Sequence, residues 1–304
     1  MKKFLAVSLL ALFSFSAAHA QEDKMLFNHL SVGITTGTPG LIGVDVATTC
    51  TPYLQIRAGI SIMPNIKYST NIKLSESDVN SFNSKRNDIN TVMGTLGLPT
   101  VNSEVQREYG VEGKLGWTNG KILFDFFPFT SNGFPLFITV GAYFGSSQII
   151  SVYNQADGSL GIVNEANTAI DAYNAYIDDP ANAAAVAAGG FTKTNNIYAS
   201  VGEYNDLGPD AQGNVKFDVK VNGFKPYLGI GFGRPVPKTK RIGFQVELGC
   251  MFWKTPVATF KGNREFDIEK DKVKDDKNVG KAIDIISKFG VWPCLTFRLC
   301  GKIF

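Results

Sequence analysis

Residues 242–252, IGFQVELGCMF, alternate between two kinds of side chain. Every even position from Ile242 to Phe252 is apolar, whereas the odd positions hold Gly243, Gln245, Glu247 and Gly249 before Met251. A period of two is typical of a β-strand with one apolar face and one polar face. The stretch is also about as long as a tilted strand must be to cross a bilayer. It therefore predicts a strand whose two faces meet different surroundings.

The same alternation recurs along the chain. It is found in residues 30–35, 42–47, 54–62, 138–145 and 295–303. Two longer segments, 111–126 and 215–232, alternate but change phase midway, at Asn119-Gly120 and at Asn222-Gly223. An Asn-Gly pair can form a two-residue hairpin, which would divide each segment into two strands. It can also form a β-bulge, which flips the facing of the side chains while one long strand continues.

The parity of the strand count separates these interpretations. Hairpins give ten strands and place long loops at both ends of the sheet. Bulges give eight strands and place every long connection on one side: residues 64–108, 153–213 and 259–287. The other side then keeps only the short links at Thr51-Pro52, Thr130 to Pro135 and Pro235 to Lys240. Long loops on one side of an even number of strands are typical of outer-membrane barrels, so we adopt the bulge interpretation.

The polar phase decides which way the strands face. It carries three acidic and three basic residues, which in a barrel would be enclosed and could pair: Asp45, Arg57, Asp125, Lys225, Glu247 and Arg298. The apolar phase would then face lipid, where only a closed sheet satisfies every backbone group. The lipid-facing candidates are Leu54, Ile56, Ile60, Phe124, Ile138, Val140, Ile230, Phe244, Val246, Leu248, Phe297 and Leu299. A soluble secreted β-sandwich or lipocalin-like barrel remains the alternative, because alternation alone fits both.

The N-terminus carries an export signal. Lys2 and Lys3 precede an apolar run that ends before Ala18-His19-Ala20, the pattern of a signal peptide over residues 1–20. Residues 21–304 would then form one outer-membrane barrel domain. The formal net charge of +3 is too small to suggest a nucleic-acid partner.

Taken together, these features resemble the outer-membrane β-barrel proteins of Gram-negative bacteria, and most closely the eight-stranded OmpA-like type. The resemblance includes the last strand, residues 295–304, with its terminal aromatic Phe304, although Phe304 falls in the polar phase rather than the lipid-facing one. It implies an all-β fold: a closed antiparallel up-and-down eight-stranded transmembrane β-barrel with long, partly helical extracellular loops. It also implies an outer-membrane location with periplasmic termini. The implied partners are outer-membrane lipid and lipopolysaccharide, and the barrel-assembly machinery during insertion.

Few residues suggest chemistry. We expect no catalytic residue, metal site or cofactor: only two His are present, and His29 is the one that follows the signal peptide. Cys50 and Cys250 fall in the outward phase, and Cys294 and Cys300, about 20 Å apart on one strand, are too distant for a disulfide. We expect the cysteines to act as small apolar filler.

Aromatic residues and loops complete the expectations. Trp117, Trp253 and Trp292 should lie at one height, with only Trp117 facing outward. Residues 75–96 and 164–177 have helical character, a second Ala-rich run covers 181–188, and 267–284 is dense in Lys and Asp. Loops of this length are usually functional or mobile, and their extracellular ligand is open.

Two functional hypotheses follow for a membrane barrel. The first is a structural or surface-interaction protein. The second is a narrow, porin-like pore for small solutes, which requires a lumen free of the enclosed charges. A barrel enzyme is disfavoured because His29 would have to serve as its base.

Overall fold

The computed structural model describes residues 29–129, 133–277 and 279–303. The expected signal peptide and Phe304 lie outside the described residues. Within them, no helix is both long and apolar enough to cross a membrane.

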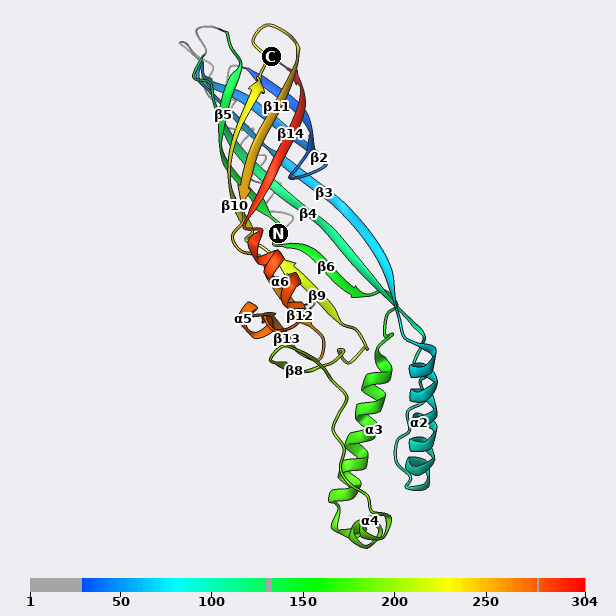
Figure 1. Cartoon of the computed structure of the whole chain (residues 1–304). Coiled ribbons are helices and arrows are strands. Elements are labelled where there is room, and N and C mark those ends of the chain that lie inside the picture. Colours follow the sequence, from blue (N-terminus) through cyan, green and yellow to red (C-terminus); the bar gives the residue numbers. More distant parts are fainter. Residues whose placement is uncertain (1–28, 130–132, 278, 304) are drawn as a thin grey trace, which may run out of the picture.

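The described chain forms a closed antiparallel barrel of eight strands, which confirms the predicted fold class (Figure 1). Along the barrel wall, each strand pairs with the next, and the last pairs with the first through Ser31 and Lys302. The ten-strand alternative is therefore wrong. The eight strands are β1 (Leu30–Gly37), β2 (Ile42–Thr51), β3 (Leu54–Lys73), β4 (Glu108–Phe126), β5 (Leu136–Gly145), β10 (Phe224–Gly233), β11 (Ile242–Phe252) and β14 (Val291–Lys302).

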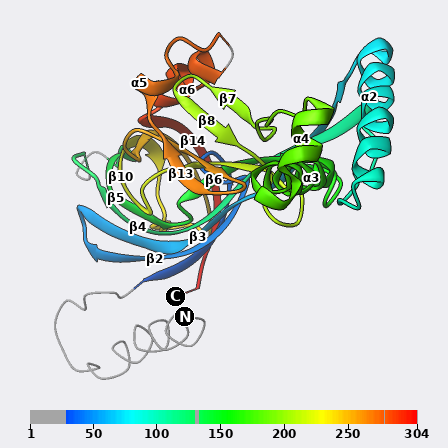
Figure 2. The same ribbon diagram turned by 90° about the horizontal axis from the view of Figure 1, so that it is seen from below.

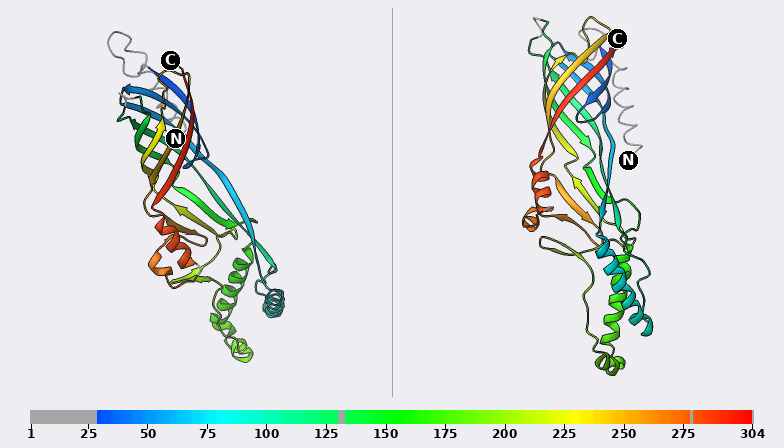
Figure 3. Two further views of the ribbon diagram at one scale, coloured as in Figure 1. Left: turned by 45° about the horizontal axis from the view of Figure 1, so that its top comes forward. Right: turned by 45° about the vertical axis from the view of Figure 1, so that its right-hand side comes forward.

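On one side, the barrel wall continues beyond the rim as an open sheet (Figures 1 and 3). We call it the extension sheet. It consists of residues 64–73 of β3 and 108–118 of β4, followed by β6 (Gln148–Asn154), β9 (Lys216–Lys220), β12 (Val257–Lys261) and β13 (Glu265–Ile268). The expectation that a loop begins at residue 64 is thus wrong, because β3 runs to Lys73, whereas the expected end of the loop at residue 108 agrees with the start of β4 at Glu108.

The chain passes the rim through short breaks. Gly145 ends β5 at φ +151°, and a Cβ there would lie 2.4 Å from the carbonyl oxygen of Thr118, so only glycine fits. Residues 221–223 separate β9 from β10. These two strands do not pair with each other, and β9 pairs with β6 and β12 while β10 pairs with β5 and β11. At Asn222-Gly223 the structure therefore has a break rather than the expected bulge.

Strand β4 is continuous, as predicted, but without the expected bulge at Asn119-Gly120. Odd residues face the barrel interior without interruption from Trp117 to Asp125. The register shift between β3 and β4 lies on β3 instead, between Met63 and Ile66. What changes near Asn119-Gly120 is which face of β4 is apolar. The apolar residues face outward in the barrel part of the strand and inward in its extension beyond the rim.

The extension sheet supports a lobe of helices and a small hairpin. The hairpin β7 (Ala199–Val201) and β8 (Tyr204–Leu207) packs with α5 (Lys270–Val273) and α6 (Val279–Lys288) over the apolar face of β9, β12 and β13. Within this lobe, hydrogen bonds from the Lys270 and Lys288 ammonium groups lower the pKa of Asp284 to about 2. The Lys- and Asp-rich segment 267–284 thus contributes to β13, α5 and α6.

Two further helices extend past the end of the sheet (Figures 1 and 2). They are α2 (Glu76–Thr95) and α3 (Gly161–Asp178), which is followed by η1 (Pro180–Asn182) and α4 (Ala183–Gly189). Met93, Ile162 and Ala166 belong to the apolar cluster that joins α2 to α3. The carboxylate of Glu165 accepts hydrogen bonds from the Ser103 hydroxyl and from the backbone N–H groups of Asn102 and Ser103, and these bonds lower its pKa.

Candidate functional site

The middle of the barrel interior holds a buried ion cluster centred on Arg57. Its Nε lies 2.7 Å from Oδ2 of Asp125, and one terminal nitrogen donates to Oδ1 of Asp125 at 2.7 Å and to Oε2 of Glu247 at 2.6 Å. The hydroxyl of Thr139 donates to the same Asp125 Oδ1 at 2.7 Å. Four barrel strands, β3, β4, β5 and β11, thus meet across the lumen at one guanidinium group.

A second cluster lies around Asp45. Its carboxylate is 2.8 Å from Nζ of Lys121 and 2.7 Å from Nε of Arg298. Arg298 also donates to the carbonyl oxygen of Pro235 at 2.8 Å, and the Ser31 hydroxyl donates to the same oxygen at 2.5 Å. Small residues make room for these long side chains: a Cβ on Gly33 would lie 2.4 Å from Nε of Arg298.

All six charged residues predicted for the lumen are buried inside the barrel, and five of them form these two clusters. Lys225 is placed apart: its ammonium group donates to the side chain of Asn119 at 3.0 Å and to the backbone oxygen of Ser146 at 2.8 Å. Sequence reasoning missed Lys121, which counting back by twos from Asp125 would have found. Buried charges in a low-dielectric interior require such partners, because an unpaired one costs several kcal/mol.

The turn end of the lumen is closed by the connection between β10 and β11. Val236 inserts there and is buried, and its N–H donates to the side-chain oxygen of Gln55 at 3.0 Å. Phe127 and Phe137 are fully buried beside it with ring centroids 5.5 Å apart. The guanidinium of Arg234 lies 4.4 Å from the centroid of Phe127, a cation–π contact.

The loop end is closed by the three tryptophans. The ring centroid of Trp117 lies 6.1 Å from that of Trp253 and 5.5 Å from that of Trp292, and its Nε1 donates to the carbonyl oxygen of Pro39 at 2.6 Å. The rings thus lie together, but Trp117 faces inward, so the prediction that it faces outward is wrong. The false outward phase came from the bulge assumed at Asn119-Gly120. Tyr143 and Tyr227, also buried, belong to the same core cluster.

The outside of the barrel is apolar. All twelve residues expected to face lipid point outward; nine are exposed and three, Leu54, Ile56 and Val246, are half-buried. A soluble barrel or sandwich would bury its apolar phase, so this arrangement contradicts the soluble alternative.

The other sequence candidates occupy minor positions. His29 lies just before β1, where its carbonyl oxygen accepts from the Thr48 hydroxyl at 3.0 Å. All four cysteines are free, and Cys294 and Cys300 are buried in the interior. Among the described residues, no group of three or more His, Cys, Asp or Glu side chains is placed to hold a metal ion.

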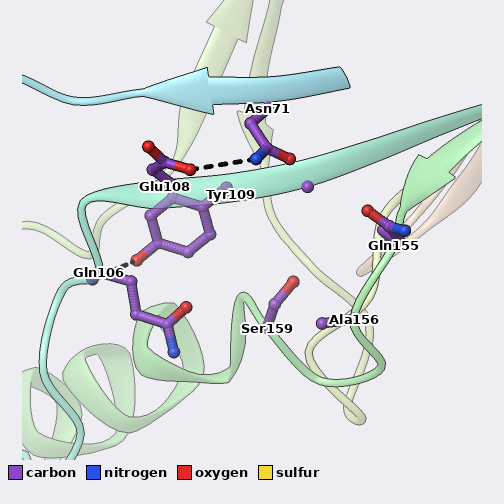
Figure 4. A pocket seen from close by; sticks show the side chains of 8 residues that line it. Asn71, Gln106, Glu108, Tyr109, Gln155, Ala156 and Ser159 are labelled. Atoms are coloured by element: carbon purple, nitrogen blue, oxygen red, sulfur yellow. Dashed lines mark hydrogen bonds between the residues drawn. The ribbon is translucent and has the colours of Figure 1, made fainter. Parts of the chain in front are cut away.

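The far end of the extension sheet contains a small polar hollow of about 310 Å³ (Figure 4). The side chains of Asn71, Glu108 and Gln155 and the ring of Tyr109 line it, and the Asn71 amide donates to Glu108 at 3.0 Å. Sequence reasoning did not foresee it, because it forms where β3, β4 and the connection from β6 to α3 meet.

These features define the class of protein. A closed eight-stranded antiparallel barrel, apolar outside and filled with paired charges inside, has the architecture of an integral membrane β-barrel and resembles the eight-stranded outer-membrane barrels in fold.

Comparison with known proteins adds two likenesses. Solved structures that resemble the chain include two from Acinetobacter baumannii. The crystal structure of Acinetobacter baumannii CarO2 has a TM-score of 0.43 and 14% identity, and covers 92% of this chain and 100% of its own. That of Acinetobacter baumannii CarO has a TM-score of 0.42 and 13% identity, and covers 91% and 99%. No protein-family model and no curated protein sequence matches the chain.

Proposed function

We propose that the protein is a closed membrane anchor: its barrel resides in the outer membrane and carries the extension sheet and helical lobe as a surface for contacts with other molecules. The filled lumen is the observation that supports this proposal. The inserted β10–β11 connection, the two ion clusters and the three tryptophans occupy successive levels of the interior. A barrel of eight strands leaves room only for such side chains.

The orientation follows from the loops. Short turns and both ends of the described chain lie at one end of the barrel, and the lobe lies at the other. In outer-membrane barrels the short turns face the periplasm, so we infer periplasmic termini and a lobe outside the cell. Lipid and lipopolysaccharide would surround the barrel, and the barrel-assembly machinery would insert it.

We also propose that the protein has neither a pore nor an enzyme function. Each lumen carboxylate engages a cation, Asp45 with Lys121 and Arg298, and Asp125 and Glu247 with Arg57. A conducting path would have to break these pairs. A general base would have to give up its partner before it could accept a proton.

Planar-bilayer recording of the purified full chain tests the closed barrel, with a known porin as the positive control. We expect a heat-modifiable band on unboiled gels, which reports the folded barrel, together with no conductance steps. Stable steps from protein that shows the heat shift would refute the closed anchor and favour the small-solute pore.

Labelling of intact cells tests the orientation. Ala185→Cys in α4 and Lys238→Cys in the β10–β11 connection are both exposed positions. A membrane-impermeant maleimide should label the Ala185→Cys variant in intact cells and the Lys238→Cys variant only after permeabilisation. The reverse pattern would contradict the proposed orientation, and the unsubstituted chain measures the background from its four cysteines.

A further inference from the structure

Beyond the rim, strand β3 is paired on one side only. Ile62 is the last β3 residue with a partner on β2, namely Ile42, whereas pairing with β4 continues to Lys73. Among the described residues, no strand pairs with residues 64–73 from the other side. Figures 1 and 3 show this part of β3 as the outer border of the sheet.

The register shows which backbone groups of this border are free. The N–H of Leu74 donates to the carbonyl oxygen of Arg107 at 2.9 Å, so Leu74 and Arg107 form a hydrogen-bonded pair. Such pairs alternate along an antiparallel ladder. Residues 66, 68, 70 and 72 therefore bond to β4, whereas 67, 69, 71 and 73 turn their N–H and C=O groups to the open side. The bond from the Gln155 N–H to the Gly110 oxygen, which directs Gly110 toward β6, agrees with this phase.

The side chains of the border form two rows of different chemistry. Ile66, Tyr68 and Ile72 lie on the face that continues from the lumen and are 50%, 74% and 56% exposed. The opposite face of the border carries Lys67 and Lys73, whose side chains are 57% and 69% exposed. A strand placed alongside would meet an apolar row on one face and ammonium groups on the other.

Natural sheets usually cover or shorten such a border, because its unpaired groups recruit other strands. Here Pro64 protects only the residue nearest the rim, and Lys67 and Lys73 share their charge with Glu112 and Glu108 on β4. Both lysine side chains remain more than half exposed, so a carboxylate arriving from the open side can also contact their ammonium groups.

We propose that residues 65–73 of β3 bind an extended segment of a partner protein by strand addition, and that this segment alternates apolar with acidic side chains. The backbone would supply the hydrogen bonds, and the two side-chain rows would supply the selectivity. This inference rests on the proposed surface-interaction function and specifies the kind of partner.

An antiparallel ladder with a second copy of the chain does not fit this border. Two copies in one membrane are related by an axis along the membrane normal, which leaves their β3 strands pointing the same way. A self-complementary antiparallel pairing of the two borders would require one copy to be inverted. A separate peptide segment has no such constraint.

The test uses fluorescent peptides as long as the free border and the full chain in detergent micelles, with binding followed by fluorescence anisotropy. One peptide alternates valine with glutamate, and its control alternates valine with lysine. We expect the acidic peptide to bind at least about tenfold more tightly. Ser69→Pro removes one open-side N–H and leaves the β4 ladder intact, so it should weaken binding about tenfold or more. Ser69→Ala keeps that N–H and should bind within about twofold of the natural chain.

Several results would overturn the proposal: equal binding of the two peptides, equal binding by the two Ser69 variants, or no binding at about 1 mM peptide. The heat-modifiable band verifies that each variant is folded. If the proline variant does not fold, Tyr68→Ser and a peptide N-methylated on alternate residues replace it, and each must reduce binding. The conductance and labelling experiments contain no peptide, so failure of the anchor function can be told apart from failure of strand addition.

Discussion

The change in the free energy of unfolding when the Arg57 guanidinium is removed reports whether water enters the lumen. The group makes three contacts of 2.6–2.7 Å with Asp125 and Glu247, and all three side chains are at most 2% exposed. Arg57→Met keeps most of the volume but leaves two carboxylates without their cation. Breaking a buried ion pair by removing one partner costs about 3–5 kcal/mol, so the folded-to-unfolded ratio should fall by a factor of roughly 150 to 5,000.

A second variant separates lost pairing from lost packing. Arg57→Met combined with Asp125→Leu, Thr139→Val and Glu247→Met removes every polar group of the cluster together. Replacing a whole buried ion cluster with apolar residues of similar volume is often neutral or stabilising, so this variant should recover most of the loss. The control is Lys193→Met, which breaks an exposed pair with Asp178 and should change the free energy of unfolding by less than about 1 kcal/mol.

Urea unfolding in micelles, followed by fluorescence of the buried tryptophans, gives these free energies. If Arg57→Met lost less than about 1 kcal/mol, water would have to solvate Asp125 and Glu247 inside the barrel. That result would refute the dry lumen, and with it the physical argument against a pore.

Three further predictions concern the lobe and the barrel wall. The Asp284 carboxyl, whose pKa is lowered, should titrate near pH 2 by NMR. Its stabilisation of the lobe is therefore present above its unfolded pKa of about 3.9 and is lost as pH falls through about 2. A titration midpoint near 4 would contradict its pairing with Lys270 and Lys288. Glu165→Ala removes three hydrogen bonds and should speed amide exchange at Ser103 on the order of tenfold, while exchange in β11 stays unchanged. Gly33→Val places a Cβ against Arg298 and should destabilise the barrel by about 1–3 kcal/mol, seen as a lower temperature of the gel shift; an unchanged temperature would show that Arg298 moves freely.

The barrel was predictable from the sequence because lipid requires the same pattern of every strand: apolar side chains on the outward face, alternating with the side chains that face inward. Alternation identified all eight strands and placed residues such as Arg57 and Glu247 on the inner face, since period two and ten-residue length leave few alternatives. It could not pair particular charges, because pairing depends on the stagger of the strands around the barrel. The Asp45–Lys121 contact, for example, joins β2 to β4 across β3.

The extension sheet escaped prediction for a different reason, which also explains the false bulge. Beyond the lipid, the outward face of β4 meets water and carries Glu112 and Lys114. Its inward face carries Leu115 and Trp117, which pack in an apolar cluster that includes residues of the barrel interior, β9 and α6. The apolar phase therefore inverts within one unbroken strand. An alternation rule that assumes a single solvent must interpret this inversion as a backbone irregularity.

In the two long strands, β3 and β4, the apolar face changes from outward to inward in different ways. In β4 the sequence exchanges its apolar and polar phases while the backbone stays regular. In β3 the apolar residues remain on even numbers, from Ile62 to Ile66, and the register shift between Met63 and Ile66 turns the backbone instead. Both changes occur beside each other, since Met63 pairs with Trp117. At the level where the barrel wall leaves the lipid, β4 thus exchanges its apolar and polar faces without a bulge, and the neighbouring β3 has a bulge but keeps its apolar residues on even numbers. The free border of β3 begins at the same level.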